Sequence, residues 1–338
     1  MKPRTLPLAA AILCTACCGP IPDVRDLTNL DAFPPVLTGI HVIDETHLRL
    51  EFDEDCEFIT PPGIVPSMET SAITCDGNSL VIEFASPQQP GTQYYIDGSV
   101  GDARGNSTDL ILHFYGFNPC VPDVLIYEFT TQGSTTHPDL VELYVRTPGN
   151  CAGMCLYEGT ERNWEEMFVI PPIEVETGDF ILVHFKPQGI PGEVDETSQT
   201  DVSEGCDAHP DAYDLWLPGG SGLSGNNGTI TLYASPHGSL VDAVLYSNRT
   251  SASDESYRGF GSLDVMERAD ELQEAGGWVA AGELIAPEDA INPDDSTSTR
   301  SICRAADPED SNCSGDWHIV PTGGYSFGEI NTDEVYEP

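Results

Sequence analysis

Apolar and polar residues alternate along much of the stretch from residue 124 to 246, a pattern that is typical of half-buried β-strands. Strand-like runs lie at 125–129 and 139–143, and a turn leads into a third run at 178–183. Asn226, Asn227 and Gly228 separate two further runs, the second of which covers 241–246. This stretch predicts one all-β sandwich, around which the rest of the chain is organised.

The same alternation occurs earlier in the chain, at 37–43, 47–52, 78–84, 90–96 and 110–115. A Pro-Gly-Thr-Gln-Tyr run at 90–94 precedes an Asp-Ala-Arg-Gly-Asn turn at 102–106. In this order the segments resemble the bacterial Ig-like domain of surface and S-layer-associated proteins. The resemblance covers residues 34–117 and implies a spacer or binding module without an active site.

The later strands resemble a second family. The segments 125–128, 141–144, 227–232 and 241–246 follow, in order, the strand signatures of the lamin tail domain, an Ig-like sandwich that also occurs in bacterial exported proteins. That family often ends with a Trp and then Thr-Pro-Gly-x-x-Asn. Here Trp317 precedes the run 326–331, Ser-Phe-Gly-Glu-Ile-Asn, in which Ser replaces Thr and Phe replaces Pro. The resemblance implies a second sandwich over 122–331, so the expected fold class is all-β, with two Ig-like β-sandwich domains in tandem.

Two stretches of the second domain are expected to be insertions, at 188–220 and 251–299. The first is a long acidic loop. The second contains a predicted helix that starts after the N-cap Ser262 and ends at Gly276. Its apolar residues fall on one helical face, which we expect to pack against the sandwich: Val265, Met266, Ala269, Leu272 and Ala275.

The chain is very acidic. Its 338 residues include 56 Asp and Glu against 13 Lys and Arg, for a formal charge of -43, and only Lys2 and Lys186 are lysines. Direct binding to nucleic acid is not expected, because that affinity depends largely on cations that replace phosphate counterions. The acidity favours a solvated surface that keeps an exported protein soluble. A saline exterior or loading with divalent cations are the alternatives.

The N-terminus resembles a bacterial lipoprotein signal peptide. A short basic region precedes an apolar run at 6–13 that is too short to span a bilayer, and Cys14, Cys17 and Cys18 follow. The small residue Ala16 favours Cys17 as the lipidated cysteine, with Cys14 and Cys18 as alternatives. We therefore expect a signal peptide at 1–17, a tether at 18–33 and a lipid anchor to the membrane of the cell envelope, facing the periplasm or the exterior.

Eight further cysteines, an even number in an exported chain, predict disulfides. Cys56 with Cys75 and Cys303 with Cys313 are the favoured local pairs, because each closes a short loop. Three connectivities stay open for the other four: Cys120, Cys151, Cys155 and Cys206. A zinc site at Cys151 and Cys155 is the less favoured alternative.

The acidic loop at 188–220 could hold Ca²⁺, which takes six to eight oxygen ligands. The candidate ligands are Asp195, Asp201, Asp207, Asp211 and Asp214. The loop lacks the Asp-x-Asp-x-Asp-Gly spacing of a dedicated site, so a solvated loop tethered by Cys206 is favoured. His137 and His209 precede prolines in acidic loops, and either could be a ligand, but a surface loop histidine without such a role is favoured.

The expected function is that of a non-enzymatic surface lipoprotein that binds or displays an extracellular protein or glycan, with the loop at 188–220 as the first candidate contact surface. No cofactor is expected apart from possible calcium. Gly-x-Ser-x-Gly, His-Glu-x-x-His and phosphate-loop motifs do not occur in the sequence. The alternative is an exported hydrolase or nuclease-associated protein with a metal-dependent site in the acidic loops, because lamin tail domains in bacteria are often joined to such enzymes.

Lipidation at Cys17 can be tested in cells with a labelled fatty acid. We expect the label to enter the protein and a Cys17→Ser change to abolish it. Labelling that survives Cys17→Ser but is lost with Cys18→Ser would move the site to Cys18. No labelling in either background would contradict a lipid anchor.

Overall fold

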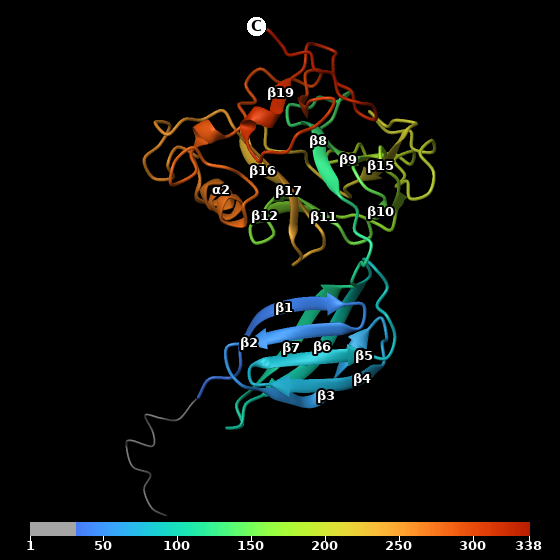
Figure 1. Cartoon of the computed structure of the whole chain (residues 1–338), viewed down its shortest axis with the longest axis vertical. Coiled ribbons are helices and arrows are strands. Elements are labelled where there is room, and N and C mark those ends of the chain that lie inside the picture. Colours follow the sequence, from blue (N-terminus) through green and yellow to red (C-terminus); the bar gives the residue numbers. More distant parts are fainter. Residues whose placement is uncertain (1–31) are drawn as a thin grey trace, which may run out of the picture.

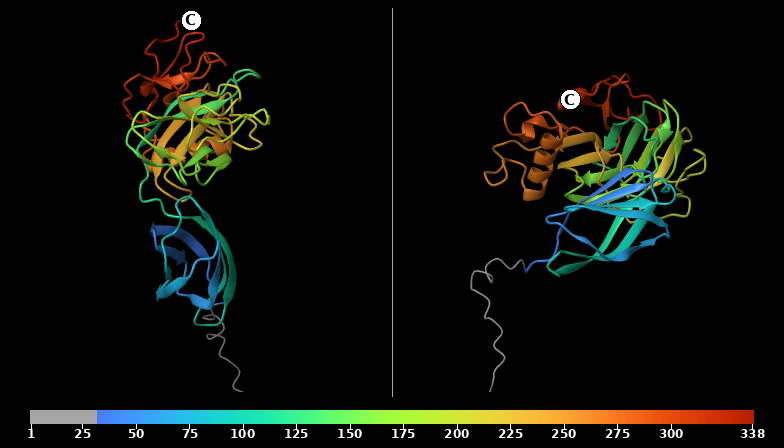
Figure 2. Two further views of the ribbon diagram at one scale, coloured as in Figure 1. Left: turned by 90° about the vertical axis from the view of Figure 1, so that its right-hand side faces the viewer. Right: turned by 60° about the horizontal axis from the view of Figure 1, so that its bottom comes forward.

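The computed structural model describes residues 32–338, which form two lobes stacked along the long axis of the molecule (Figures 1 and 2). The chain passes from the first lobe to the second through residues 116–123. The expected signal peptide, most of the expected tether and Cys17 lie outside the described residues. No helix in the described part of the chain is long and apolar enough to cross a membrane.

The first lobe consists of two antiparallel sheets that face each other across one core (Figure 1). Its strands are β1 (Leu37–Asp44), β2 (His47–Phe52), β3 (Glu57–Val65), β4 (Thr70–Asp76), β5 (Ser79–Phe84), β6 (Gln93–Gly101) and β7 (Ser107–Tyr115). One sheet has the order β1-β2-β5-β4 and the other β3-β6-β7.

Strict alternation explains why β2 and β5 were predictable from sequence. Leu48, Leu50 and Phe52 point into the core, and the residues between them are partly exposed. Strand β3 was not predicted. It contains two prolines, and its register with β6 shifts twice, between Phe58 and Thr60 and between Thr60 and Gly63. A bulged strand loses the period of two on which prediction rests.

The second lobe contains two larger sheets, with strand orders β15-β14-β9-β8-β18-β19 and β12-β11-β16-β17, and a small β10-β13 pair. The strands are β8 (Val124–Thr130), β9 (Leu140–Val145), β10 (Gly149–Asn150), β11 (Cys155–Gly159), β12 (Trp164–Val169), β13 (Glu174–Val175), β14 (Phe180–His184), β15 (Ala212–Trp216), β16 (Asn227–Tyr233), β17 (Leu240–Ser247), β18 (Ile302–Arg304) and β19 (Trp317–Ile319). The largest apolar core takes side chains from both sheets. The prediction of a mostly β chain is confirmed.

The predicted helix is confirmed as α2 (Leu263–Ala275), and the short 3-10 helices η1 (Pro287–Asp289) and η2 (Ser314–Asp316) follow it. Ser262 caps α2 by accepting a hydrogen bond from the Val265 N–H, and Gly276 ends it in the left-handed conformation. Val265, Ala269 and Leu272 are buried in the main core. The helix therefore packs on the sandwich, as the position of its apolar face predicts.

The stretch expected as an acidic loop at 188–220 is not a loop throughout. Residues 212–216 form β15, which pairs in parallel with β14 at the edge of the six-stranded sheet. The strand is short and has the charged Asp214 at its centre, so its sequence shows no clear strand signal. Asn227 and Gly228, expected to separate two strands, already belong to β16.

The two lobes touch through glycines. A side chain on Gly91 would lie 2.6 Å from the backbone nitrogen of Gly153, so neither position has room for a Cβ. Asn118 Nδ2 adds hydrogen bonds to the carbonyls of Asn150 (2.6 Å) and Ala152 (3.0 Å). Gly91 belongs to the Pro-Gly-Thr run at 90–92, and its lack of a side chain allows the backbones of the two lobes to come into contact.

The eight described cysteines are free thiols in this structure, so the disulfide pairings remain predictions. The Cys56 N–H donates to the Gly77 carbonyl beside Cys75, and burial together with the nearby Cys75 raises the pKa of Cys56 to about 11. Cys303 lies 3.5 Å from His318 Nε2, whereas Cys313 contacts Ser311. Cys56 and Cys75 are therefore near each other, whereas Cys303 and Cys313 contact different residues.

A buried ion pair joins the two sheets of the second lobe. Arg304 on β18 donates from Nη2 to Asp242 on β17 (3.1 Å) and from Nε to the Ile126 carbonyl on β8 (2.9 Å). Arg304 and Asp242 are almost fully buried, and the guanidinium also lies 4.6 Å from the centre of the Trp317 ring. Desolvation raises the pKa of Asp242 to about 7 against the lowering effect of Arg304. The pair is the polar link in an otherwise apolar contact between sheets.

We expect Arg304→Met to lower the free energy of unfolding of the second lobe by about 3–5 kcal/mol, because it leaves Asp242 buried without its cation. The exposed pair of Arg146 and Asp123 is the control, and Arg146→Met should cost less than about 1 kcal/mol. Tryptophan fluorescence in urea measures this lobe alone, because all four tryptophans lie in it. Equal stabilities for the two variants would contradict the linking role of the pair.

Candidate functional site

The outer face of the six-stranded sheet carries a transverse row of polar side chains. In register, Asp214 and Glu142 flank Leu182, Glu128 lies opposite Glu142, and Cys303 pairs with Glu128. Glu128, Glu142 and Asp214 are almost fully buried. Such a row needs a covering layer, because a buried carboxylate requires hydrogen-bond donors or a proton.

The C-terminal segment supplies that cover for the two glutamates. Glu128 accepts hydrogen bonds from the Ser326 N–H (3.1 Å) and hydroxyl (3.0 Å) and from the Ser301 hydroxyl. Glu142 Oε2 accepts from the Gly328 N–H (2.5 Å), while its Oε1 has no hydrogen-bond partner among the described residues. Ser326 and Gly328 therefore hold the two buried acids in place, and we call residues 326–331 the clamp.

Asn331 completes the same clamp. Its Nδ2 donates to the carbonyls of Tyr127 (3.1 Å) and Arg304 (2.9 Å), and its backbone N–H donates to the Tyr127 hydroxyl (3.2 Å). Phe327 packs into a small apolar cluster with Tyr127 and Phe180. The residues that the sequence singled out at 326–331 thus have a structural task, which is to close the outer face.

A histidine and an aspartate lie at the other end of the row. His184 Nε2 is 2.7 Å from Asp214 Oδ1, both groups are buried, and the imidazole stacks on Trp216 with ring centres 3.7 Å apart. Asp214 Oδ2 accepts from the His209 N–H (2.9 Å). Desolvation raises the pKa of Asp214, and His184 opposes that rise. Both oxygens of this carboxylate are engaged in holding the fold together.

Two further histidine contacts fasten the acidic loop. His137 Nδ1 lies 2.9 Å from Asp207 Oδ1, and His209 Nε2 lies 3.9 Å from Glu329 Oε1 of the C-terminal segment. The buried Glu196 accepts from three backbone N–H groups of the loop and β15, those of Val202, Ser203 and Asp214. The loop at 188–220 is therefore anchored on both sides by its own carboxylates.

The five candidate calcium ligands do not converge. Asp195 accepts from the Trp216 N–H (2.8 Å), Asp207 pairs with His137, and Asp214 pairs with His184. Asp201 and Asp211 are exposed. Within residues 32–338, no group of three or more His, Cys, Asp or Glu side chains is arranged to hold a metal ion. Calcium binding to this loop stays a prediction.

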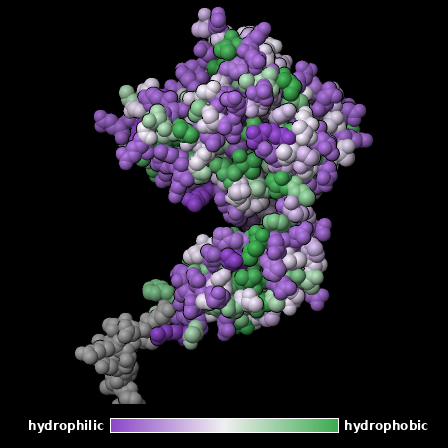
Figure 3. Space-filling model, viewed as in Figure 1, coloured by the Kyte–Doolittle hydropathy of each residue, from purple (hydrophilic) through white to green (hydrophobic). Residues whose placement is uncertain are grey.

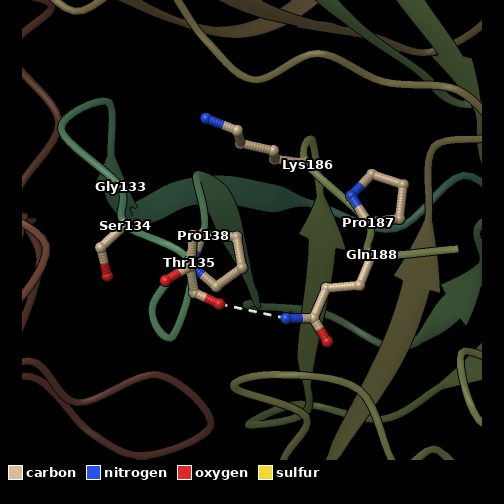
Figure 4. Close-up of a pocket in the computed structure, with 7 residues that line it drawn as sticks. All are labelled: Gly133, Ser134, Thr135, Pro138, Lys186, Pro187 and Gln188. Carbon is tan, nitrogen blue, oxygen red and sulfur yellow. Dashed lines mark hydrogen bonds between the residues drawn. The ribbon is translucent and has the colours of Figure 1, made fainter. Parts of the chain in front are cut away.

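A pocket of about 320 Å³ opens at the edge of this face, between the loop that precedes β9 and the chain that leaves β14. It is lined by Gly133, Ser134, Thr135, Pro138, Lys186, Pro187 and Gln188 (Figure 4). Gln188 Nε2 donates to the Thr135 carbonyl (3.0 Å) and joins the two walls, and the Lys186 side chain extends across toward Gly133 and Ser134. Lys186 is the single lysine of the described residues and forms no ion pair with them.

The floor of the pocket is fixed by Asp139. Its Oδ1 accepts from the Gly133 N–H (2.6 Å), and its Oδ2 accepts from the Leu223 N–H (2.9 Å). Burial raises the pKa of Asp139, whereas these two hydrogen bonds and the nearby Lys186 lower it. The Lys186 ammonium is near enough to lower the pKa of Asp139 but forms no ion pair with it, so it is available to the pocket.

Sequence reasoning missed most of the pocket. The scarcity of lysine singled out Lys186, but nothing local indicated that residues 133–135 lie opposite it. The residues come together only because β9 and β14 are antiparallel neighbours. The buried glutamates Glu128 and Glu142 were also missed, since each reads as an exposed polar position of an alternating strand.

Residues 122–319 match the family model TP_1001_2nd, described as "protein second domain". The chain belongs to this family. It is also similar to an uncharacterized protein of Treponema pallidum (strain Nichols), with 26% identity over 205 residues. The match covers 60% of this chain and 52% of that protein, so the chain spans about half the length of its relative. The matched residues lie in the second lobe and include the anchored loop and the pocket, whereas the clamp residues 326–331 lie beyond the match.

The buried glutamates predict a second lobe that is more stable at pH 5 than at pH 7.5. Desolvation raises the pKa of Glu128 from 4.5 to about 7, and desolvation together with Glu128 raises the pKa of Glu142 well above 4.5. An acid whose pKa is raised on folding stabilises the fold below its unfolded pKa and loses that contribution as pH rises through the folded pKa. For Glu128 this contribution to the free energy of unfolding is about 3 kcal/mol, and it is lost as the pH rises from about 4.5 to about 7.

The measurement is the free energy of unfolding in urea, followed by tryptophan fluorescence at the two pH values. Glu128→Gln keeps the shape of the side chain and removes its titration, so it should reduce the difference between pH 5 and pH 7.5. Glu176→Gln, on an exposed turn, is the control and should leave the difference unchanged. A wild-type protein that is equally stable at both pH values, or less stable at pH 5, would contradict this account.

Proposed function

We propose that this chain is a non-enzymatic surface lipoprotein of the cell envelope, anchored through Cys17, in which the second lobe binds an extracellular protein or glycan. In this proposal the first lobe is an Ig-like spacer and the second a lamin-tail-like sandwich. The observation that carries the proposal is the pocket at Lys186, whose walls are held by fixed contacts and whose cation is unpaired among the described residues.

The way in which the acidic groups are used supports binding over catalysis. A general base or nucleophile must be free to exchange a proton or attack a substrate. Glu196, Asp214 and Asp139 each accept two or more hydrogen bonds that hold loops to the sheet. These groups therefore build a rigid support for loops, which is what a recognition surface requires.

The arrangement of the surface agrees with a display role. Hydrophilic residues cover much of the face shown in Figure 3, and apolar residues gather where the two lobes meet. The pocket lies in the second lobe, whereas the described chain begins in the first, so an N-terminal anchor would leave a whole lobe between membrane and pocket. This spacing suits contact with a partner outside the envelope.

The proposal predicts saturable binding without turnover. The full chain, purified in detergent, is passed over arrays of purified glycans and extracellular peptides and is assayed for nuclease, esterase and peptidase activity. At least one ligand should bind, and Thr135→Trp, which fills the pocket mouth, should weaken that binding at least tenfold. Ser107→Trp, on an exposed position of the first lobe, is the matched control.

Two results would contradict the proposal. One is reproducible turnover that a single change such as Asp214→Asn or His184→Gln abolishes. The other is a set of ligands that all bind equally well to the wild type and to Thr135→Trp, because the contact surface would then lie elsewhere.

A further inference from the structure

Several of the groups that line the pocket at Lys186 are hydrogen-bond donors. The Lys186 ammonium contributes up to three N–H donors, and the Thr135 hydroxyl and backbone N–H have no partner among residues 32–338. Gln188 Nε2 uses one hydrogen for the Thr135 carbonyl and keeps the second. The Ser134 hydroxyl accepts from the His137 N–H (3.1 Å) and lies 3.3 Å from Thr136 Oγ1, so it is already engaged within its own loop.

Several acceptors in the same region already accept hydrogen bonds, although Gln188 Oε1 has no partner among the described residues. The Thr135 carbonyl accepts from Gln188, and both Asp139 oxygens accept from backbone N–H groups. The nearby Glu193 carboxylate accepts from the N–H groups of Gln188 (2.5 Å) and Gly189 (2.7 Å). The unpaired Lys186 ammonium, with these donors beside it, therefore favours a ligand that brings an anionic acceptor.

This local chemistry is opposite to the charge of the whole chain. With a formal charge of -43 the protein repels anions at long range, but screening at physiological salt limits that repulsion to about 8 Å. At contact, a charge-assisted hydrogen bond from a lysine to a carboxylate is about twice as strong as a neutral one. A ligand with a single carboxylate on a neutral body suits these two conditions better than a polyanion, which the surrounding acids would repel.

We propose that the pocket at Lys186 binds a carboxylate group carried by an otherwise neutral ligand. In this proposal Lys186 provides the charge, and Thr135 and Gln188 donate hydrogen bonds that orient the group. Pro138 and Pro187 supply apolar contact for the neutral part. The inference rests on the proposed binding function and names the chemical class of the ligand. Two sources offer this chemistry, a peptide C-terminus and an acidic sugar.

The test is calorimetry of the full chain in detergent with two matched probe pairs. Acetyl-alanyl-alanine is compared with its C-terminal amide, and galacturonic acid with galactose. We expect at least one acid to bind at least tenfold more tightly than its neutral partner, with an affinity that falls as salt rises. Binding of only one acid supports the proposal and identifies the source of the carboxylate.

Three variants locate the effect. Lys186→Met should weaken binding of the acid at least tenfold, whereas Lys186→Arg should retain most of it. Arg146→Met removes one cation from a different exposed part of the same lobe and should change nothing, which separates local contact from net charge. The thermal midpoint of each variant is measured first, and Lys186 is exposed, so its replacement should leave folding intact.

The carboxylate proposal is overturned if each acid binds no better than its neutral partner, or if Lys186→Met and Arg146→Met weaken binding equally. These outcomes leave the proposed function standing if the arrays still yield a ligand that Thr135→Trp blocks. A ligand that ignores Thr135→Trp removes the proposed function as well, so the two failures are distinguishable.

Discussion

The buried guanidinium of Arg304 is the interaction on which the second lobe most depends. The cation reaches from β18 to Asp242 on the other sheet, and it also donates to the backbone of β8, the neighbour of β18 in the same sheet. It also donates to the Glu309 carbonyl and lies near Asp310 and Asp316, so it fixes the loop between β18 and β19. Burial makes the pair costly to form and more costly to break. The strand β18 is three residues long, and this side chain adds to its pairing with β8 and β19.

The position of β18 then decides how the outer face of the sheet is closed. Asn331 binds the Arg304 carbonyl, and Ser301, next to β18, binds Glu128. The C-terminal segment that lies across the buried glutamates is thus also tied to β18. The segment 326–331 covers one end of the polar row, and the His184–Asp214 pair lies at the other end. The pocket at Lys186 opens at the edge of this face. Buried carboxylates therefore hold the loops of this face in place, and the exposed Lys186 lies at their edge.

Local patterns were sufficient for the parts of this fold that repeat with a period of two. The strands β2, β5, β8 and β17 and the capped helix α2 were predictable because their signals lie within about ten residues. The strands β3, β15, β18 and β19 were not, because bulges, a parallel edge pairing or a length of three residues give no periodic signal. The motif at 326–331 was visible from resemblance, but its task was not, since Glu128 and Glu142 lie nearly two hundred residues earlier.

The central claim is that the Lys186 ammonium is free in the protein and meets its ligand directly. The most direct measurement is NMR of the chain after reductive methylation with ¹³C-formaldehyde, since Lys186 is one of only two lysines and Lys186→Arg assigns its signal. The account predicts that the Lys186 resonance moves on addition of acetyl-alanyl-alanine and stays in place on addition of its amide. A Lys186 resonance that moves with neither probe, while another part of the protein responds to the acid, would contradict the account.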